Sequence, residues 1–260
     1  MITLNDYLYS GDTLLRILHN YSGDLRRDAR KSRNEIDLAH CNFLLQITEL
    51  LEHNDFLTAQ SQKIREFYKY MAREYPFLAF TFKGRIKSLI RAEEKFNGYI
   101  VEYIYDYHME HGTYPSVSEI KNRLTCFRDL IAYRIVISMP RCHLKSEQDR
   151  EKVEEKYLYK IANVLPAFLE ERGFTVESAR GIMESPSEFL RDEVRPYYRD
   201  YVAGKTPQDY RSLHITLYDN SSRCFMEVQL RTKSMDDVAE IGPANHLGYE
   251  KGQDEARARR

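Results

Sequence analysis

Residues 213–230 have the sequence LHITLYDNSSRCFMEVQL, in which two apolar runs flank a short polar turn. Runs of β-branched and aromatic residues that stop at Asn and Ser are typical of strands joined as an antiparallel hairpin. We therefore expect strands at 213–219 and 223–230. This is the one place in the chain where two expected strands are joined by a short turn.

Three further strands are expected upstream of the hairpin, separated by helical segments. The apolar run LIAYRIVISM at 130–139 predicts a buried strand, FLAFTF at 77–82 a second and FTVESARGIM at 174–183 a third. The segment GRIKSLIRAEEKF at 84–96 predicts a helix after its glycine. Residues 147–173 predict one long amphipathic helix that ends at the final glycine.

Both ends of the chain have helical patterns. Residues 1–75 repeat apolar side chains at helical spacing without a proline, and the tail from Lys233 has the same character. Residues 184–209 are polar and turn-rich, which is typical of a long functional loop. These elements predict an α/β (α+β) fold, with a mixed sheet of about five strands flanked by helices and a helical N-terminal region.

The composition is that of an ordinary globular protein of 260 residues, long enough for one or two domains. Hydrophobic residues make up 42% and charged residues 30%, which argues against wholesale disorder. The 39 basic and 40 acidic residues nearly cancel, so overall charge does not demand a nucleic-acid partner. Four dispersed cysteines fit a reducing compartment. Without an evident signal peptide or membrane span, we expect a cytoplasmic protein with no membrane partner.

The sequence lacks the motifs of several common functional sites. The sequence contains no GxxxxGK[ST], GxGxxG or GxSxG pattern, which argues against a P-loop, a dinucleotide fingerprint and a hydrolase nucleophile elbow. His108 and His111 lie three residues apart, but no third zinc ligand accompanies them. Residues 26–33 include five basic residues, which either coat a solvated helix face or contact a nucleic-acid backbone.

Two carboxylates adjoin the expected strands. Asp129 directly precedes the run LIAYRIV, and Glu227 lies within FMEVQL. Side chains two apart on a strand share a face, so Gln229 and Arg231 should lie on the same face as Glu227. Each carboxylate alone is more often an ion-pair partner than a metal ligand.

A cationic stripe is expected near these carboxylates. Lys87, Arg91 and Lys95 are spaced by four, so a helix would present them on one face. Two carboxylates beside Lys and Arg suit a Mg²⁺ ion that holds a polyphosphate, because Mg²⁺ takes one or two carboxylates plus phosphate oxygens.

Four segments occur in a fixed order along the chain: GRIKSLIRAEEKF, DLIAYRIVI, DYVAGKTPQDYRSLHITL and MEVQLRTKSMDDVAEIGPANHLGYEKG. Together they resemble the synthetase domain of the RelA/SpoT family, the alarmone synthetases that transfer pyrophosphate from ATP to the 3′-hydroxyl of GDP or GTP. The resemblance implies a nucleotidyltransferase-like synthetase domain at 76–252, preceded by the helical region at 1–75 and followed by a short helical tail at 253–260. No HD-type hydrolase region is seen, so the chain is similar to the small, single-function members.

The resemblance also implies a role for each matching residue. The matches to ATP-binding residues are Arg85, Lys87, Lys95 and Arg134. Arg91 is also expected to bind ATP, although it stands where the family has a serine. Asp129 and Glu227 match the catalytic carboxylates associated with Mg²⁺, and Glu227 is the one placed to deprotonate the acceptor hydroxyl. Lys205, Tyr210, His214 and Gln229 match the acceptor pocket, in which the tyrosine stacks on the acceptor base. His246 matches a family histidine to which we assign no role.

The loop at 205–210 departs from the family. Where the family usually has PKPNGY, this chain has KTPQDY, so Thr206 stands at the usual lysine position and Lys205 one step earlier. Gln and Asp at 208–209 replace Asn and Gly. Loss of the glycine removes easy access to positive φ, and an added carboxylate would repel an acceptor diphosphate. The donor side is nearly intact, so ATP is better supported than GDP.

Three hypotheses for function remain. The first is a synthetase of (p)ppGpp that uses Mg²⁺, ATP and GDP or GTP; the near-neutral charge and the prevalence of this activity in the family favour it. The second resembles the toxic small members that modify the 3′ CCA end of tRNA and are neutralised by a separate antitoxin protein; the altered loop and residues 26–33 favour it. The third, an inactive nucleotide- or RNA-binding module, is disfavoured because the carboxylates and donor cations are present.

Overall fold

The computed structural model describes residues 4–8, 14–52, 54–86, 92, 96–116, 118–120, 128–145, 149–179, 187–204, 209–221 and 224–240. The chain forms two compact units, one made of residues 1–59 and 87–127 and the other of residues 60–86 and 128–260. The expected division at 1–75, 76–252 and 253–260 stays a prediction.

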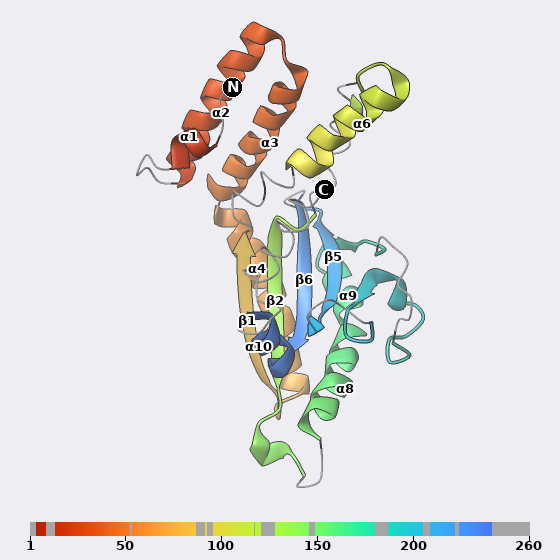
Figure 1. Ribbon diagram of the computed structural model, residues 1–260. Helices are drawn as coiled ribbons and strands as arrows, with labels where there is room; N and C mark the ends of the chain where they lie inside the picture. Colours follow the sequence, from red (N-terminus) through yellow and green to blue (C-terminus); the bar gives the residue numbers. More distant parts are fainter. Residues whose placement is uncertain are drawn as a thin grey trace. The chain divides into compact units, whose positions relative to one another are not determined.

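The first unit is helical in its described part, as the apolar spacing of the N-terminal region predicts (Figure 1). Helix α2 packs against α3 and buries Leu18 and Leu25, and α3 buries Phe43. Its elements are α1 (Asn5–Leu8), α2 (Leu14–Ser32), α3 (Glu35–Glu52), the first residues of α4 (Asn54–Glu74), the π-helical turn η1 (Asn97–Val101) and α6 (Glu102–His111).

A six-stranded mixed sheet forms the second unit (Figure 1). The strand order is β1-β2-β6-β5-β3, with β4 paired to β5; β2 and β6 are parallel and the other pairs are antiparallel. This confirms the expected mixed sheet flanked by helices, and the expected hairpin is the β5–β6 pair. The strands are β1 (Ala79–Ile86), β2 (Ile131–Ser138), β3 (Phe174–Val176), β4 (Tyr198–Asp200), β5 (Leu213–Asp219) and β6 (Cys224–Thr232).

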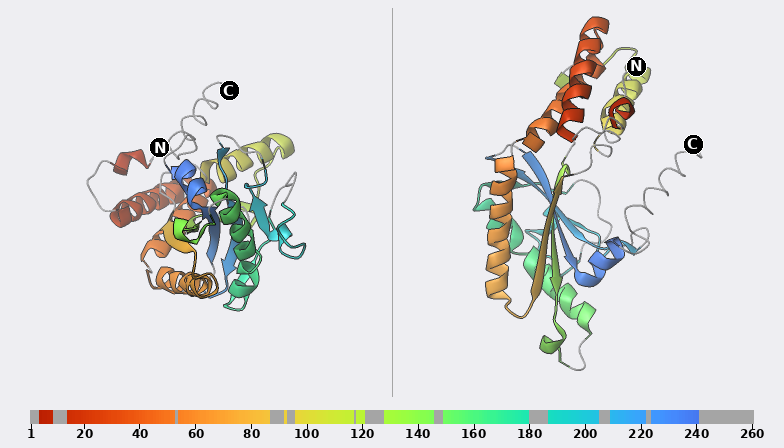
Figure 2. Two further views of the ribbon diagram at one scale, coloured as in Figure 1. Left: turned by 90° about the horizontal axis from the view of Figure 1, so that it is seen from below. Right: turned by 90° about the vertical axis from the view of Figure 1, so that its left-hand side faces the viewer.

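The two faces of the sheet differ in chemistry. The residues of α4 that belong to this unit, together with α8 (Arg150–Ala162) and α9 (Leu165–Glu170), lie on one face, and α10 (Lys233–Glu240) lies on the other (Figure 2). Val228 and Leu230 are fully buried, and each such aliphatic side chain contributes about 1.5–3 kcal/mol to stability. Glu227 and Gln229 alternate with them and point to the face that holds α10, which confirms the expected alternation.

The strand β1 is longer than the sequence predicts. Residues 84–86 pair with β2, so the start of the segment 84–96 is strand and not helix. Gly84 is needed there because a Cβ atom would lie 2.9 Å from a ring carbon of Tyr133, its cross-strand partner. Ladder hydrogen bonds to β2 therefore override the helical pattern at residues 84–86.

Three other expectations need correction. The helix expected at 147–173 is interrupted after Ala162, and α9 begins with Pro166 in its first turn, where the missing N–H of proline costs nothing. In the described part of 174–183, the strand covers only Phe174–Val176. The expected loop at 184–209 contains the turn η3 (Arg195–Tyr197) and the strand β4, which pairs with β5. A further short turn, η2, covers Arg141–His143.

No helix in the described part of the chain is both long and apolar enough to cross a membrane.

Candidate active site

A row of polar side chains crosses the face of the sheet that holds α10. Cross-strand partners on neighbouring strands point to the same face. The register pairs one residue from each of five strands in sequence: Lys83 on β1, Arg134 on β2, Gln229 on β6, His214 on β5 and Arg199 on β4. Segments far apart in the sequence thus contribute basic side chains and one amide to a single line.

The next row on the same face contains the candidate catalytic carboxylate. Arg85 pairs with Ala132, Ala132 with Glu227, and Glu227 with Thr216. The register therefore puts Arg85 and Glu227 in one row, although the side chain of Arg85 lies outside the described residues. By backbone register, positions 85 and 227 thus belong to the same face of the sheet.

Five side chains form a closed ring of hydrogen bonds on this face of the sheet: Glu227, Gln229, Arg231, Tyr210 and His214. Arg231 Nη2 donates to Tyr210 Oη at 2.6 Å and to Gln229 Oε1 at 3.0 Å. Gln229 Nε2 donates to Glu227 Oε2 at 2.7 Å. His214 joins the remaining gap, with Nε2 2.8 Å from Tyr210 Oη and Nδ1 3.1 Å from Glu227 Oε1.

The hydrogen-bonding pattern of the ring depends on the protonation of His214. With a neutral imidazole, the Tyr210 hydroxyl donates to His214 Nε2 and His214 Nδ1–H donates to Glu227; with an imidazolium, both ring N–H groups donate, and Tyr210 Oη accepts from Arg231 and from His214. In either state, one oxygen of Glu227 accepts from His214 and the other from Gln229. This arrangement holds both oxygens of the carboxylate in fixed positions.

Glu227 is 8% exposed and ionised. Burial by itself raises the pKa of this carboxyl, but the charge and hydrogen bond of His214, the Gln229 amide and the charge of Arg199 together lower the pKa to about 2. A carboxylate with this pKa stays charged throughout the physiological range, which suits a ligand for a hard cation, whereas the low pKa makes it a weak proton acceptor.

Tyr210 is held from one side by a cation. The Arg231 guanidinium lies over its ring at 5.0 Å from the centroid, and the Tyr201 ring meets it edge-on at 6.0 Å. Burial raises the pKa of Tyr210, and the neighbouring Arg231 opposes this rise. The phenol therefore stays protonated and orients the histidine. A planar base could stack only on ring surface that Arg231 and Tyr201 leave open.

Arg134 retains hydrogen-bonding capacity although it is paired. Its Nη1 lies 3.1 Å from Asp236 Oδ1 and 2.6 Å from Glu240 Oε1, both on α10. Its Nε is buried and has no hydrogen-bond partner among the residues that the structure describes. A buried guanidinium nitrogen without a partner is costly, and a phosphate oxygen is the type of group that would satisfy it.

Asp129 lies just before β2 and is half-buried. It is three residues from Ala132, the register partner of Glu227, so it lies about 10 Å along the strand direction from that row. Within the described residues, no group of three or more His, Cys, Asp or Glu side chains is arranged to hold a metal. The donor set fits a Mg²⁺ ion that takes one or two carboxylates from the protein and its other ligands from phosphate and water.

The remaining site residues expected from the sequence lie outside the described residues; they are Lys87, Arg91, Lys95, Lys205 and His246. Sequence reasoning placed Arg231 on the correct face without a role, and it missed Lys83, Arg199 and Asp236. Arg199 gave no signal in the sequence, because residues 184–209 were expected to form a loop and the pairing of β4 with β5 places Arg199 beside His214. Nothing local in the sequence indicates that Lys83 or Asp236 meets Arg134.

The backbone at position 209 bears on the loss of the family's glycine from this loop. Asp209 adopts φ of +56°, the left-handed conformation that the family's glycine would take. Asp and Asn tolerate this region better than other residues with a side chain. Position 209, directly before Tyr210, therefore adopts a positive φ without a glycine, at some cost in stability.

Asp200 anchors the segment that leads to this turn. It is 1% exposed, and its carboxylate accepts hydrogen bonds from Tyr159 Oη and from the backbone N–H groups of Ser187, Val202 and Ala203, all between 3.0 and 3.1 Å. These bonds fix the chain on both sides of β4. They thereby position Tyr201, whose ring contacts both Tyr210 and His214.

Comparison with known proteins gives a family match over most of the chain. The model of the family described as "Region found in RelA / SpoT proteins" matches residues 84–254. The GTP pyrophosphokinase of Escherichia coli (strain K12) is 36% identical over 75 residues, which cover 29% of this chain and 9% of that protein. The GTP pyrophosphokinase rsh of Brucella ovis is 42% identical over 52 residues, which cover 20% of this chain and 7% of that protein. The aligned segments thus span less than a tenth of the length of these curated relatives.

Among solved structures, the small alarmone synthetase 2 from Bacillus subtilis is 20% identical, with a TM-score of 0.39 over 79% of this chain and 80% of that chain.

Proposed function

Because the chain belongs to the RelA/SpoT family, we propose that it is a pyrophosphokinase that transfers the β,γ-pyrophosphate of ATP to the 3′-hydroxyl of GDP or GTP and releases AMP. One observation carries the proposal. The ring around Glu227 joins an ionised, buried carboxylate to Tyr210, His214 and Gln229. These residues match the family's catalytic base and acceptor pocket.

The proposed chemistry balances as a single displacement. The 3′-oxygen of the acceptor forms a bond to the β-phosphorus of ATP, and the bond from that phosphorus to the oxygen bridging to the α-phosphate breaks. The bridging oxygen leaves with AMP. The hydroxyl proton passes to Glu227, whose carboxylate is already ionised and held in place by His214 and Gln229. The protein's contribution is mainly positioning and charge stabilisation.

The donor would bind beside the polar row. The Nε of Arg134 has no hydrogen-bond partner in the described part of the chain, which supports a phosphate or base contact there. Arg85, Lys87, Arg91 and Lys95 are proposed to neutralise the triphosphate. Asp129 and Glu227 would hold Mg²⁺, which supplies phosphate charge neutralisation and polarisation of the phosphoryl oxygens when it is bound.

A second candidate acceptor is the 3′ CCA end of tRNA, which would make the chain a translation-blocking toxin with a separate antitoxin partner. The basic residues in the last turns of α2 and directly after it favour this acceptor, since Arg27, Arg30, Lys31 and Arg33 are all exposed. Exposed Lys and Arg on one helix are suited to contact a nucleic-acid backbone. The carboxylate of Asp209 beside the acceptor pocket also disfavours a free diphosphate.

A transfer assay separates these candidates. Purified protein with Mg²⁺ and ATP labelled in its β- and γ-phosphates is given GDP, GTP or deacylated tRNA in separate tubes. Label in a guanosine product supports the first proposal, and label at the tRNA 3′ end supports the second. Absence of label in every tube, with ATP binding intact, would reject both and favour an inactive binding module. The Glu227→Gln variant is the matched control, because it should abolish transfer but keep the shape of the site.

A further inference from the structure

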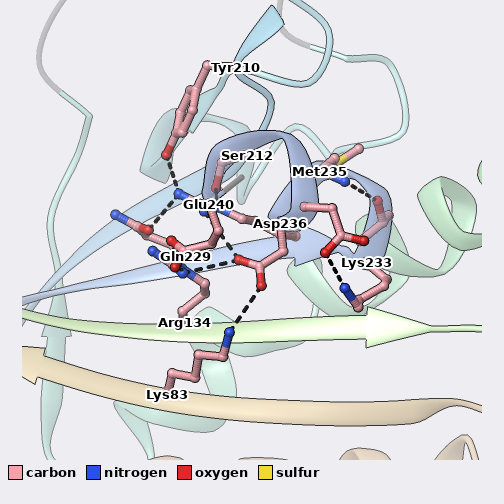
Figure 3. Close-up of polar contacts among 12 residues, drawn as sticks. Lys83, Arg134, Tyr210, Ser212, Gln229, Lys233, Met235, Asp236 and Glu240 are labelled. Atoms are coloured by element: carbon pink, nitrogen blue, oxygen red, sulfur yellow. Dashed lines mark hydrogen bonds and ion pairs between the residues drawn. The ribbon is translucent and has the colours of Figure 1, made fainter. Parts of the chain in front are cut away.

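Asp236 joins three strands through a single carboxylate. Its Oδ1 lies 3.1 Å from Arg134 Nη1 on β2 and 3.4 Å from Arg231 Nη1 on β6, and its Oδ2 lies 3.3 Å from Lys83 Nζ on β1 (Figure 3). The residue is only 4% exposed. Two of these cations belong to different parts of the proposed site: Arg134 faces the donor, and Arg231 holds the acceptor residues Tyr210 and Gln229.

Helix α10 holds this carboxylate firmly in place. Its first turn is capped by a hydrogen bond from Met235 N to Thr232 Oγ1 at 3.3 Å, and Met235 and Ala239 are buried against the sheet. A side chain buried on an anchored helix cannot withdraw when a nucleotide arrives. Asp236 is therefore better suited to a fixed counter-ion than to a displaceable competitor for phosphate.

The cations and carboxylates around Asp236 carry a net positive charge, which favours binding of an anion. Lys83, Arg134 and Arg231 face two carboxylates, Asp236 and Glu240, so these groups retain one positive charge. Asp236 thus lowers the mutual repulsion of the three cations without cancelling their attraction for phosphate.

We propose that Asp236 is a positioning residue that sets Arg134 and Arg231 at once, and so ties the donor pocket to the acceptor pocket. This proposal rests on the proposed function. Without the carboxylate, Arg231 loses a charge-assisted hydrogen bond and Arg134 loses an ion pair, and each guanidinium turns away from its present direction. Loss of a single side chain on α10 therefore weakens both nucleotide sites, although Asp236 itself contacts neither nucleotide.

Three variants of α10 test this coupling. Asp236→Asn should weaken binding of both donor and acceptor by about tenfold each. Glu240→Gln removes a carboxylate that pairs, among the described residues, with Arg134 alone, so it should weaken only the donor. Asp237→Asn is the control, because Asp237 pairs with Lys233 at the surface of the same helix and should change neither affinity.

Binding is measured by equilibrium dialysis without turnover. The donor probe is α,β-methylene-ATP with Mg²⁺, which cannot be cleaved between its α- and β-phosphates. The acceptor probe is whichever of GDP and deacylated tRNA receives label in the transfer assay. Thermal unfolding of each variant is recorded alongside, and Asp236→Glu, which keeps the charge, should restore part of both affinities.

The outcomes distinguish the two proposals. Unchanged affinities in Asp236→Asn, or a loss confined to the donor, would overturn the coupling while leaving the proposed function intact. Tighter donor binding would identify Asp236 as a competitor for phosphate and would also overturn it. A wild-type protein that binds no nucleotide would overturn the proposed function and this proposal with it.

Discussion

Replacement of Glu227 by Gln should remove a large acid-dependent component of the protein's stability. The pKa of Glu227 is about 2, against an ordinary value of 4.5. Because the folded state lowers this pKa, the ionised carboxylate stabilises the fold, fully above the unfolded pKa and progressively less as pH falls towards 2. The difference corresponds to about 3 kcal/mol at pH 7, of which about 2 kcal/mol is lost by pH 3.

The assay is urea unfolding of both proteins at pH 7 and pH 3, followed by circular dichroism. Between these pH values, the free energy of unfolding of wild type should fall by about 2 kcal/mol more than that of the Glu227→Gln variant. The control is Glu171→Gln, because the side chain of Glu171 is 77% exposed and should leave the wild-type pH dependence unchanged. At pH 7 the Glu227→Gln variant should also lose transfer activity by about 10²–10⁴-fold.

Parallel losses of stability in wild type and the Glu227→Gln variant would refute the reasoning. That result would mean that His214, Gln229 and Arg199 do not stabilise the ionised carboxylate in solution, and the ring would then have no electrostatic basis.

Three other substitutions probe the supports of the site. Asp209→Gly should stabilise the protein by about 1 kcal/mol, because Asp209 has φ of +56°; if the acceptor is a diphosphate, its KM should also fall, and a lower melting temperature would contradict the argument. Asp200→Asn should destabilise by about 2–4 kcal/mol, since it puts an amide N–H₂ among the donors that Asp200 now accepts from; an unchanged urea midpoint would show that these bonds contribute little. Gly84→Ala should cost about 1–3 kcal/mol, because its Cβ would lie 2.9 Å from the Tyr133 ring; adding Tyr133→Ala should recover part of that loss, and no recovery would point to another cause.

Periodicity in the sequence determined a large part of this protein. Helical spacing predicted the N-terminal helices, and the alternation in FMEVQL correctly placed Glu227, Gln229 and Arg231 on one face of β6. Both inferences depend on residues that are near neighbours in the chain. Local geometry alone relates such residues, so a pattern of two or about four is enough to predict their faces.

Only the tertiary structure decided which elements meet. The register of β1, β2, β6, β5 and β4 aligns Lys83, Arg134, Gln229, His214 and Arg199 in one row, and each pairing is a hydrogen-bonded choice between distant segments. The same pairing extended β1 through Gly84 and recruited β4 from an expected loop. Asp236 meets Arg134 because α10 folds back over the sheet, and no local pattern encodes that return. The candidate catalytic group could therefore be predicted from the sequence, whereas the cations around it became neighbours only through the pairing of distant strands.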